Sequence, residues 1–146
     1  MSTDPVSAGR SLRMAWVMDP IESVDIDADT SFALMLAAQE RGHGLWVVDP
    51  ADLGVGSAGP TARARRVTLR REKGNHVDVG ESELLVLDRD IDVAWQRKDP
   101  PVDAEFVTAT QILGLCHQTL VLNRPASILA ANEKLYALNF PDPVSY

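Results

Sequence analysis

The sequence predicts an α/β fold, in which helices flank a mainly parallel sheet. Short apolar runs alternate along the chain with helix-like segments, which is the order expected of βαβ units. The length of 146 residues, with 45% hydrophobic and 24% charged residues, suits one compact domain. Polar residues or prolines also follow each apolar run, as they do at the ends of parallel strands. We therefore expect a Rossmann-like sheet of about four core strands, with a β-hairpin insertion.

The first strand is expected over residues 14–18 (MAWVM), where an Asp-Pro pair stops the apolar run. A polar loop then leads to a helix from Phe32 to about Arg41. Thr30 or Ser31 is its expected cap, because a hydroxyl oxygen accepts a hydrogen bond from the first free backbone N–H groups. Gly42 is expected to end the helix, since glycine adopts the left-handed conformation at little cost.

The second strand is expected over residues 45–48 (LWVV). Residues 51–60 are rich in Gly, Ala and Ser, and we expect an irregular connection there. Residues 62–69 and 76–79 alternate between polar and apolar types around a charged turn, which predicts an exposed hairpin. The remaining predicted elements are a strand over 91–96, a helix from Ala104 to about Leu113 capped by Asp103, a strand over 119–123, and a helix from Ile128 to about Leu138 capped by Ser127.

The composition excludes several classes of protein. With 14 basic and 21 acidic residues the net charge is −7, and an acidic surface repels nucleic acid. No apolar stretch approaches the roughly 18 residues of a membrane-spanning helix, so we expect no membrane association. Cys116 is the only cysteine, which fits a reducing compartment, and we expect a cytoplasmic protein.

The ends of the four core strands rank highest as candidate site positions, because ligands of parallel sheets bind beyond the carboxyl ends of the strands. Asp19, Asp49, Arg97 and Asn123 occupy these positions. Arg97 begins the string RKDPP, whose two prolines hold the preceding backbone extended. Its guanidinium suits a bidentate grip on a carboxylate or a phosphate. The alternative is a structural Arg-Asp pair at a proline turn.

Several other motifs carry weaker signals. Gly54, Gly56 and Gly59 have the spacing of a dinucleotide-binding loop, but no helix is expected after them, so an NAD-binding half-domain is a minor alternative. Asp25, Asp27 and Asp29 lack the Gly and Glu that complete a calcium loop. The three histidines have no zinc-ligand spacing, so no metal site is expected. A catalytic role for Cys116 is also disfavoured.

Six of the 14 basic residues fall within 11 positions, between residues 63 and 73. They are Arg63, Arg65, Arg66, Arg70, Arg71 and Lys73. We favour a solvated strand edge that charge keeps from pairing with other chains. The alternative is a stripe that binds an acidic partner. An acidic body and a basic hairpin would also suit a homo-oligomer, and the sequence leaves the oligomeric state open.

Five motifs together resemble the N-terminal part of the bacterial glutathione synthetase family, whose members are ATP-grasp ligases. These are VMDP (17–20), DTSFAL (29–34), RKDPP (97–101), NRP (123–125) and NEKL (132–135). Their order and spacing match as well, and the resemblance covers roughly residues 14–140. It implies that residues 14–126 form the domain that precedes the ATP-grasp module, after a flexible extension over 1–13. Residues 127–146 would begin the linker or ATP-grasp region.

The resemblance also implies a reaction, in which ATP and Mg²⁺ convert γ-glutamylcysteine to an acyl phosphate that glycine then attacks. The matching positions make Arg97, Asp19 and Ser31 substrate-binding residues and Lys134 an ATP-binding residue. Trp95 and Gln96 depart from the aliphatic residue and methionine that the family motif has before RKDPP. We expect this chain to be a fragment that is inactive alone, because the catalytic ATP-grasp domain would follow it.

One alternative comes from a different class of protein. A stand-alone, flavodoxin-like binding or signalling domain would use Asp19, Asp49 and Lys98 at the strand ends for phosphoacceptor chemistry. The hairpin insertion and the count of four strands fit this alternative poorly. A small phosphodonor would distinguish the two hypotheses, because only the signalling domain would become phosphorylated.

Overall fold

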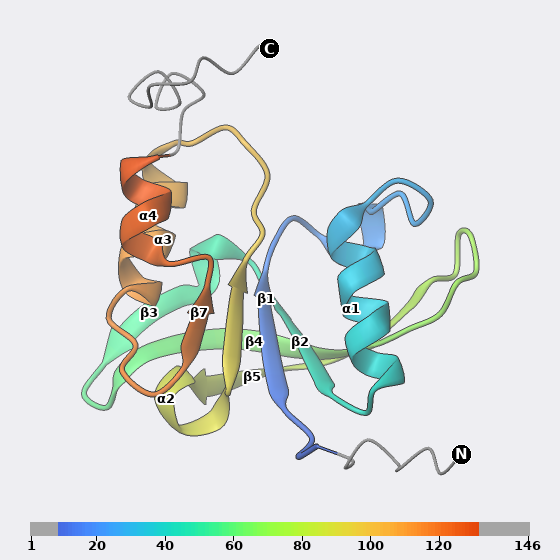
Figure 1. Cartoon of the computed structure of the whole chain (residues 1–146), viewed down its shortest axis with the longest axis horizontal. Coiled ribbons are helices and arrows are strands. Elements are labelled where there is room, and N and C mark those ends of the chain that lie inside the picture. The colour runs from blue at the N-terminus through green and yellow to red at the C-terminus, as the bar shows by residue number, and fades with distance from the viewer. Residues whose placement is uncertain (1–8, 132–146) are drawn as a thin grey trace, which may run out of the picture.

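Seven strands form one mixed sheet with helices on both of its faces (Figure 1). The computed structural model describes residues 9–131. The strands are β1 (Arg13–Val17), β2 (Gly44–Val48), β3 (Leu53–Gly56), β4 (Gly59–Leu69), β5 (Val77–Val86), β6 (Val93–Gln96) and β7 (Leu120–Leu122). The α-helices are α1 (Thr30–Glu40), α2 (Leu87–Asp90), α3 (Ala104–Leu113) and α4 (Pro125–Ala130), and two short 3₁₀ helices are η1 (Ile21–Ser23) and η2 (Pro50–Asp52).

The four expected core strands pair in parallel in the order β2-β1-β6-β7. Trp16 of β1 lies between Val47 of β2 and Trp95 of β6. Helix α1 connects β1 to β2, and helix α3 connects β6 to β7. These are the βαβ units that the alternation of apolar runs and helical segments predicts.

The prediction of a mainly parallel, four-stranded sheet is nevertheless wrong, because β3, β4 and β5 add three antiparallel strands. The eleven-residue β4 pairs with β5 along one side, and with β3 and then β2 along the other. The expected exposed hairpin is therefore built into the sheet. Its alternation is a burial pattern, in which Ala62, Ala64, Val67 and Leu69 are buried. The alternation within one strand does not show which other strands pair along its two edges.

Residues 51–60, expected to be irregular, contain the end of η2, strand β3 and the turn into β4. Gly56 faces Gly59 across this tight turn, and Gly59 has a φ of +106° that favours glycine. The glycine-rich composition thus reflects a hairpin turn between two strands. The second half of β5 was also missed, because residues 80–84 are exposed and include two glutamates.

The observed helix ends match some of the predicted caps and differ from others. Asp103 caps α3 as predicted, and Gly42 follows α1 with a φ of +86°. The predicted cap of α1 is wrong: Asp29 accepts the hydrogen bond from the Phe32 N–H at 2.7 Å. A carboxylate is a charged acceptor that also interacts favourably with the helix dipole, so it outcompetes the two hydroxyls that follow.

The last predicted helix begins earlier than expected. Helix α4 starts at Pro125 after Arg124, so Ser127 is not its cap. Proline suits the first helical position because the missing N–H is not needed there. Within the described residues the helix ends at Ala130, and the remainder of the predicted helix lies outside them.

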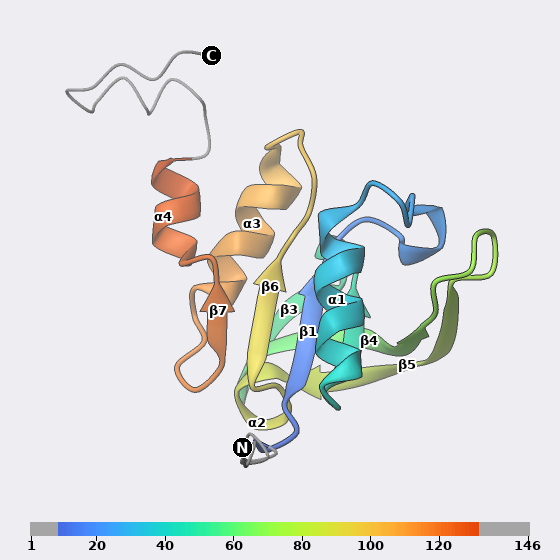
Figure 2. The same ribbon diagram turned by 45° about the vertical axis from the view of Figure 1, so that its right-hand side comes forward.

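Two apolar cores lie on the two faces of the sheet. Phe32 and Met35 of α1 pack on one face with Trp16, and Ala109 and Leu113 of α3 pack on the other. Both helices begin near the end of the sheet where β1 and β6 finish (Figure 2). In the part of the chain that the structure describes, no helix has the length and apolarity to cross a membrane.

Candidate functional site

The candidate site lies where β1 and β6 end side by side. Strand β1 has β2 on one side and β6 on the other, so the strand order changes direction between β1 and β6. Open α/β sheets bind ligands at such a switch point, because the loops that follow the two strands diverge there. Figure 2 shows both loops leaving the sheet at the end where α1 begins.

Arg97 is the first residue after β6. Its backbone N–H donates to the Val17 carbonyl at 2.8 Å, which extends the pairing of β6 with β1 by one position. Side chains alternate along a strand, so Arg97 points to the α1 face of the sheet, as Trp95 does. There its Nε donates to the hydroxyl of Ser31 at 2.9 Å.

The terminal nitrogens of the Arg97 guanidinium have no polar partner within residues 9–131. Nη1 and Nη2 make no hydrogen bond or ion pair with any of these residues. The Arg-Asp pair considered from the sequence is therefore not formed within these residues. Ser31 is only 5% exposed, so its hydroxyl fixes the Nε edge and leaves the other edge for a carboxylate or a phosphate.

Asp19, which follows β1, pairs with the residue after Arg97. Lys98 Nζ lies 3.0 Å from Asp19 Oδ1, and the Asp99 backbone N–H donates to Asp19 Oδ2 at 3.3 Å. The bond to Asp19 raises the pKa of the Lys98 ammonium, although burial opposes the shift. Asp19 thus ties the β1 loop to the RKDPP segment and neutralises Lys98, whereas Arg97 has no acidic partner within residues 9–131.

Gln96 holds the same segment from the opposite face of the sheet. This buried side chain donates to the Thr110 hydroxyl of α3 at 2.9 Å, and its carbonyl oxygen accepts from the Lys98 N–H at 3.3 Å. Sequence reasoning assigned Gln96 no part in the site. A polar residue at the end of an otherwise apolar strand is the signal that could have found it.

The structure brings together three of the four predicted site residues, Asp19, Ser31 and Arg97. With Lys98 they form a group that we call the rim. Lys134, the predicted ATP contact, lies outside the described residues. Asp49, at the end of β2, lines a small pocket beside Asp19, so the ends of β1 and β2 are also neighbours.

The other candidate motifs have structural roles. Two glycines of the dinucleotide-like spacing lie in β3 and the third begins β4, so they belong to a β-hairpin, whereas a dinucleotide loop leads from a strand into a helix. Asp29 caps α1, and Asp27 pairs with Lys73. No group of three metal-ligating side chains is close enough to hold a metal within residues 9–131. Burial raises the pKa of the Cys116 thiol to about 11, so this cysteine is protonated at neutral pH and is a poor nucleophile.

Several basic residues of β4, and Arg70 directly after it, are engaged within the chain. Arg65 pairs with Glu22, Arg70 pairs with Asp78, and the Arg66 guanidinium lies over the Trp46 ring. Because β4 is paired along both sides, the favoured interpretation of a charged free edge is wrong. These arginines connect neighbouring parts of the domain instead.

Comparison with known proteins identifies similar sequences. The family model for the N-terminal domain of prokaryotic glutathione synthetase matches residues 12–128. A glutathione synthetase of Yersinia pestis is 42% identical over 133 residues, which are 90% of this chain and 41% of the relative. One from Bradyrhizobium diazoefficiens is 42% identical over 131 residues, covering 89% of this chain and 41% of the relative.

A third glutathione synthetase, from Gloeobacter violaceus, is 39% identical over 140 residues, which are 91% of this chain and 43% of the relative. The chain thus spans about two fifths of the length of the relatives that it matches. These similarities confirm the resemblance that the five sequence motifs indicate.

Proposed function

Since the chain belongs to the family of the prokaryotic glutathione synthetase N-terminal domain, we propose that it is the substrate-binding part of a ligase. The ligase joins glycine to γ-glutamylcysteine and converts ATP to ADP and phosphate. The observation that carries this proposal is the Arg97 guanidinium at the switch point of the sheet, whose Nη1 and Nη2 edge has no partner among residues 9–131. γ-Glutamylcysteine carries two carboxylates, and a guanidinium edge suits either of them.

The rim residues have separate tasks in this proposal. Arg97 binds a carboxylate of the dipeptide, and Ser31 orients the guanidinium through the bond to Nε. Asp19 holds Lys98 and the RKDPP backbone in place. Fixing a substrate carboxylate in this way contributes to catalysis by positioning, because the reacting groups then meet without further loss of freedom.

The chemical step requires ATP, Mg²⁺ and glycine. Residues 9–131 offer no cluster of carboxylates for Mg²⁺, so the binding proposed here involves no metal. We assign the metal and most of the ATP contacts to the part of the longer relatives that lies outside the matched region. Lys134 is proposed as a contact to the ATP phosphates. On this proposal the isolated chain binds the dipeptide but does not turn it over.

The test is calorimetric titration of the chain with γ-glutamylcysteine. Replacement of Arg97 by alanine is expected to weaken binding by at least about tenfold, because a charge-assisted bidentate contact is lost. Arg97→Lys keeps the charge without the planar fork, and we expect intermediate affinity. Arg41→Ala is the matched control, since this exposed arginine follows α1 at the end remote from Ser31. Equal affinities of Arg97→Ala and the unmodified chain would remove Arg97 from the site.

A fusion tests the ligase itself. The chain would be joined to the part of the Yersinia pestis relative that follows the matched region, and ADP release would be measured with γ-glutamylcysteine and glycine. Release that requires both substrates supports the proposal. A phosphorylated Asp19 or Asp49 after incubation of the chain with acetyl phosphate would favour the phosphoacceptor alternative instead.

A further inference from the structure

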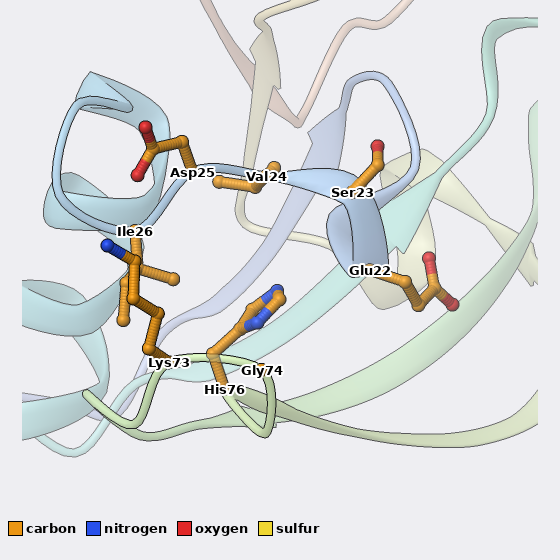
Figure 3. A pocket seen from close by; sticks show the side chains of 8 residues that line it. All are labelled: Glu22, Ser23, Val24, Asp25, Ile26, Lys73, Gly74 and His76. Carbon is orange, nitrogen blue, oxygen red and sulfur yellow. The ribbon is translucent and has the colours of Figure 1, made fainter.

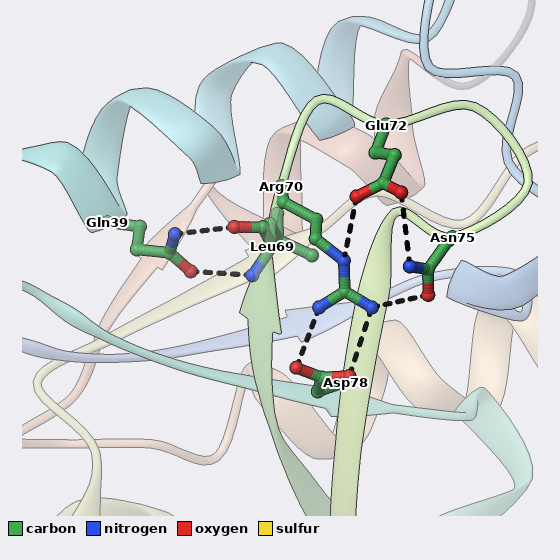
Figure 4. Close-up of polar contacts among 6 residues, drawn as sticks. All are labelled: Gln39, Leu69, Arg70, Glu72, Asn75 and Asp78. Carbon is green, nitrogen blue, oxygen red and sulfur yellow. Dashed lines mark hydrogen bonds and ion pairs between the residues drawn. The ribbon is translucent and has the colours of Figure 1, made fainter.

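The segment that joins β4 to β5, together with the first two residues of β5, is held together by Arg70, and we call residues 70–78 the hairpin tip. The Arg70 guanidinium binds both carboxylate oxygens of Asp78 at 2.7 and 3.1 Å and the Asn75 side-chain oxygen at 2.5 Å (Figure 4). The Arg70 backbone N–H also donates to the His76 carbonyl at 2.9 Å. The tip is therefore an ordered structure and not merely a charged turn.

Helix α1 fixes the base of this tip. The Gln39 side chain donates to the Leu69 carbonyl at 2.8 Å and accepts from the Leu69 N–H at 2.7 Å, as a neighbouring strand would (Figure 4). These two bonds fix the end of β4 against the second half of α1. The other contacts of the tip therefore act from a position that is fixed relative to this helix.

The tip then contacts the loop that precedes α1, which we call loop 21–29. His76 is buried and its Nε2 lies 2.7 Å from the Ile21 carbonyl. A carbonyl oxygen only accepts, so Nε2 carries the proton. The imidazole also meets the Phe32 ring edge-on at 5.8 Å. At the outer end of the loop, Lys73 pairs with Asp27 at 2.9 Å.

The contact between the tip and loop 21–29 is not continuous packing. A pocket of about 270 Å³ separates them, lined by Glu22–Ile26 on one side and by Lys73, Gly74 and His76 on the other, with the His76 ring directed into it (Figure 3). The loop is also held by Ile21 and Ile26, which are buried in the core with Phe32, and by the pair of Glu22 with Arg65. Of the contacts that the tip itself supplies, the Lys73–Asp27 pair is exposed, and exposed ion pairs contribute little. The bond from His76 is the buried polar contact between the tip and the loop.

Loop 21–29 connects two members of the rim. Asp19 lies two residues before it, and Ser31 lies two residues after it. We propose that the hairpin tip positions the rim, with His76 as the positioning residue that holds Ser31 and Asp19 against Arg97 and Lys98. This inference rests on the proposed function, since the rim is the site that it serves.

The test compares the chain with His76→Phe, which keeps an aromatic ring beside Phe32 but has no donor for the Ile21 carbonyl. The readout is the NMR signal of the Arg97 Nε–H group, whose bond to Ser31 sets its chemical shift and its exchange with water. We expect this signal to shift and to exchange faster in His76→Phe. The dissociation constant for γ-glutamylcysteine should rise about tenfold.

Two variants serve as controls. His76→Gln places an amide donor near the position of Nε2, and should restore the Arg97 signal and bring the affinity within about twofold of the original. Lys73→Ala removes only the exposed ion pair and should change neither readout. If His76→Phe does not fold, as judged by circular dichroism, His76→Asn replaces it, because its side chain is too short to reach the same carbonyl.

An unchanged Arg97 signal in a folded His76→Phe protein, with faster amide exchange in loop 21–29, would overturn the inference, since the loop would then move without affecting the rim. The NMR measurement needs no ligand. Failure of γ-glutamylcysteine to bind the original chain would therefore count against the proposed function alone, and the Arg97 signal would still decide the role of His76.

Discussion

At the residue scale, Asp88 of α2 binds the backbone of the segment that connects α3 to β7. Its carboxylate accepts backbone N–H groups from His117, Gln118 and Thr119 at 2.9 to 3.0 Å. Burial alone would raise the pKa of this carboxyl. The three backbone donors together lower the pKa by more than burial raises it, so the pKa lies below its ordinary value of 3.8. The ionised form is the one that stabilises the fold.

This shift predicts an acid-dependent loss of stability. A carboxyl whose pKa is lowered on folding stabilises the native state above its unfolded pKa, and this contribution is lost as the pH falls through the folded value. We expect Asp88→Asn to reduce the free energy of unfolding at pH 7 by about 1–2 kcal/mol. In thermal melts from pH 7 to pH 2, the difference between variant and original should shrink below about pH 3.8. Asp52→Asn, at an exposed position, should show no such convergence.

The neighbourhood of the candidate site residues could be predicted from the sequence where strand ends and prolines carried the information. Arg97 and Asp19 follow apolar runs at strand ends, whereas Ser31, a predicted helix cap, joined the candidate site through the family resemblance. Their partners were not predictable. The pairing of Asp19 with Lys98, and the support from His76, depend on side-chain directions and on contacts between distant segments.

At the element scale, α3 packs on one face of the sheet, and Asp103 caps its first turn. The Asp103 carboxylate accepts from the Phe106 N–H at 2.9 Å. Asp103→Ala removes this cap and should lower the free energy of unfolding by about 1 kcal/mol, because a helix N–H loses its acceptor. Urea titration would measure it. Asp103→Ser retains an acceptor and should lose less than half as much; equal losses for both variants would show that the cap bond is not the cause.

Elements whose own residues show a clear strand or helix pattern were predicted correctly. The parallel strands and helices α1 and α3 have apolar runs or caps that identify them locally. The last two residues of β3 and residues 80–84 of β5 are exposed, and these segments are rich in glycine or glutamate, so their strand conformation comes from pairing with β4. Pairing with a neighbouring strand overrides local preference there, which is why β3 and the second half of β5 were not expected, although β4 and the start of β5 were expected as a hairpin.

At the scale of the whole molecule, stability should be graded across the sheet. Strand β1 pairs on both sides and is covered on both faces, whereas β7 pairs only with β6 among residues 9–131. We expect the amides of β1 to exchange with solvent only through global unfolding, and those of β7 through local opening. Hydrogen exchange followed by mass spectrometry measures this. Equal protection of β1 and β7 would contradict the gradient.

The central place of β1 has a consequence for the order of events during translation. This strand leaves the ribosome before the other strands of residues 9–131, yet Asp92, which binds the Arg13 backbone, lies 79 residues further along. His76 likewise follows its partner Ile21 by 55 residues. Long-range pairings of this kind form late, because distant segments must first be synthesised and brought together. A nascent chain can therefore assemble the rim only after β6 has emerged.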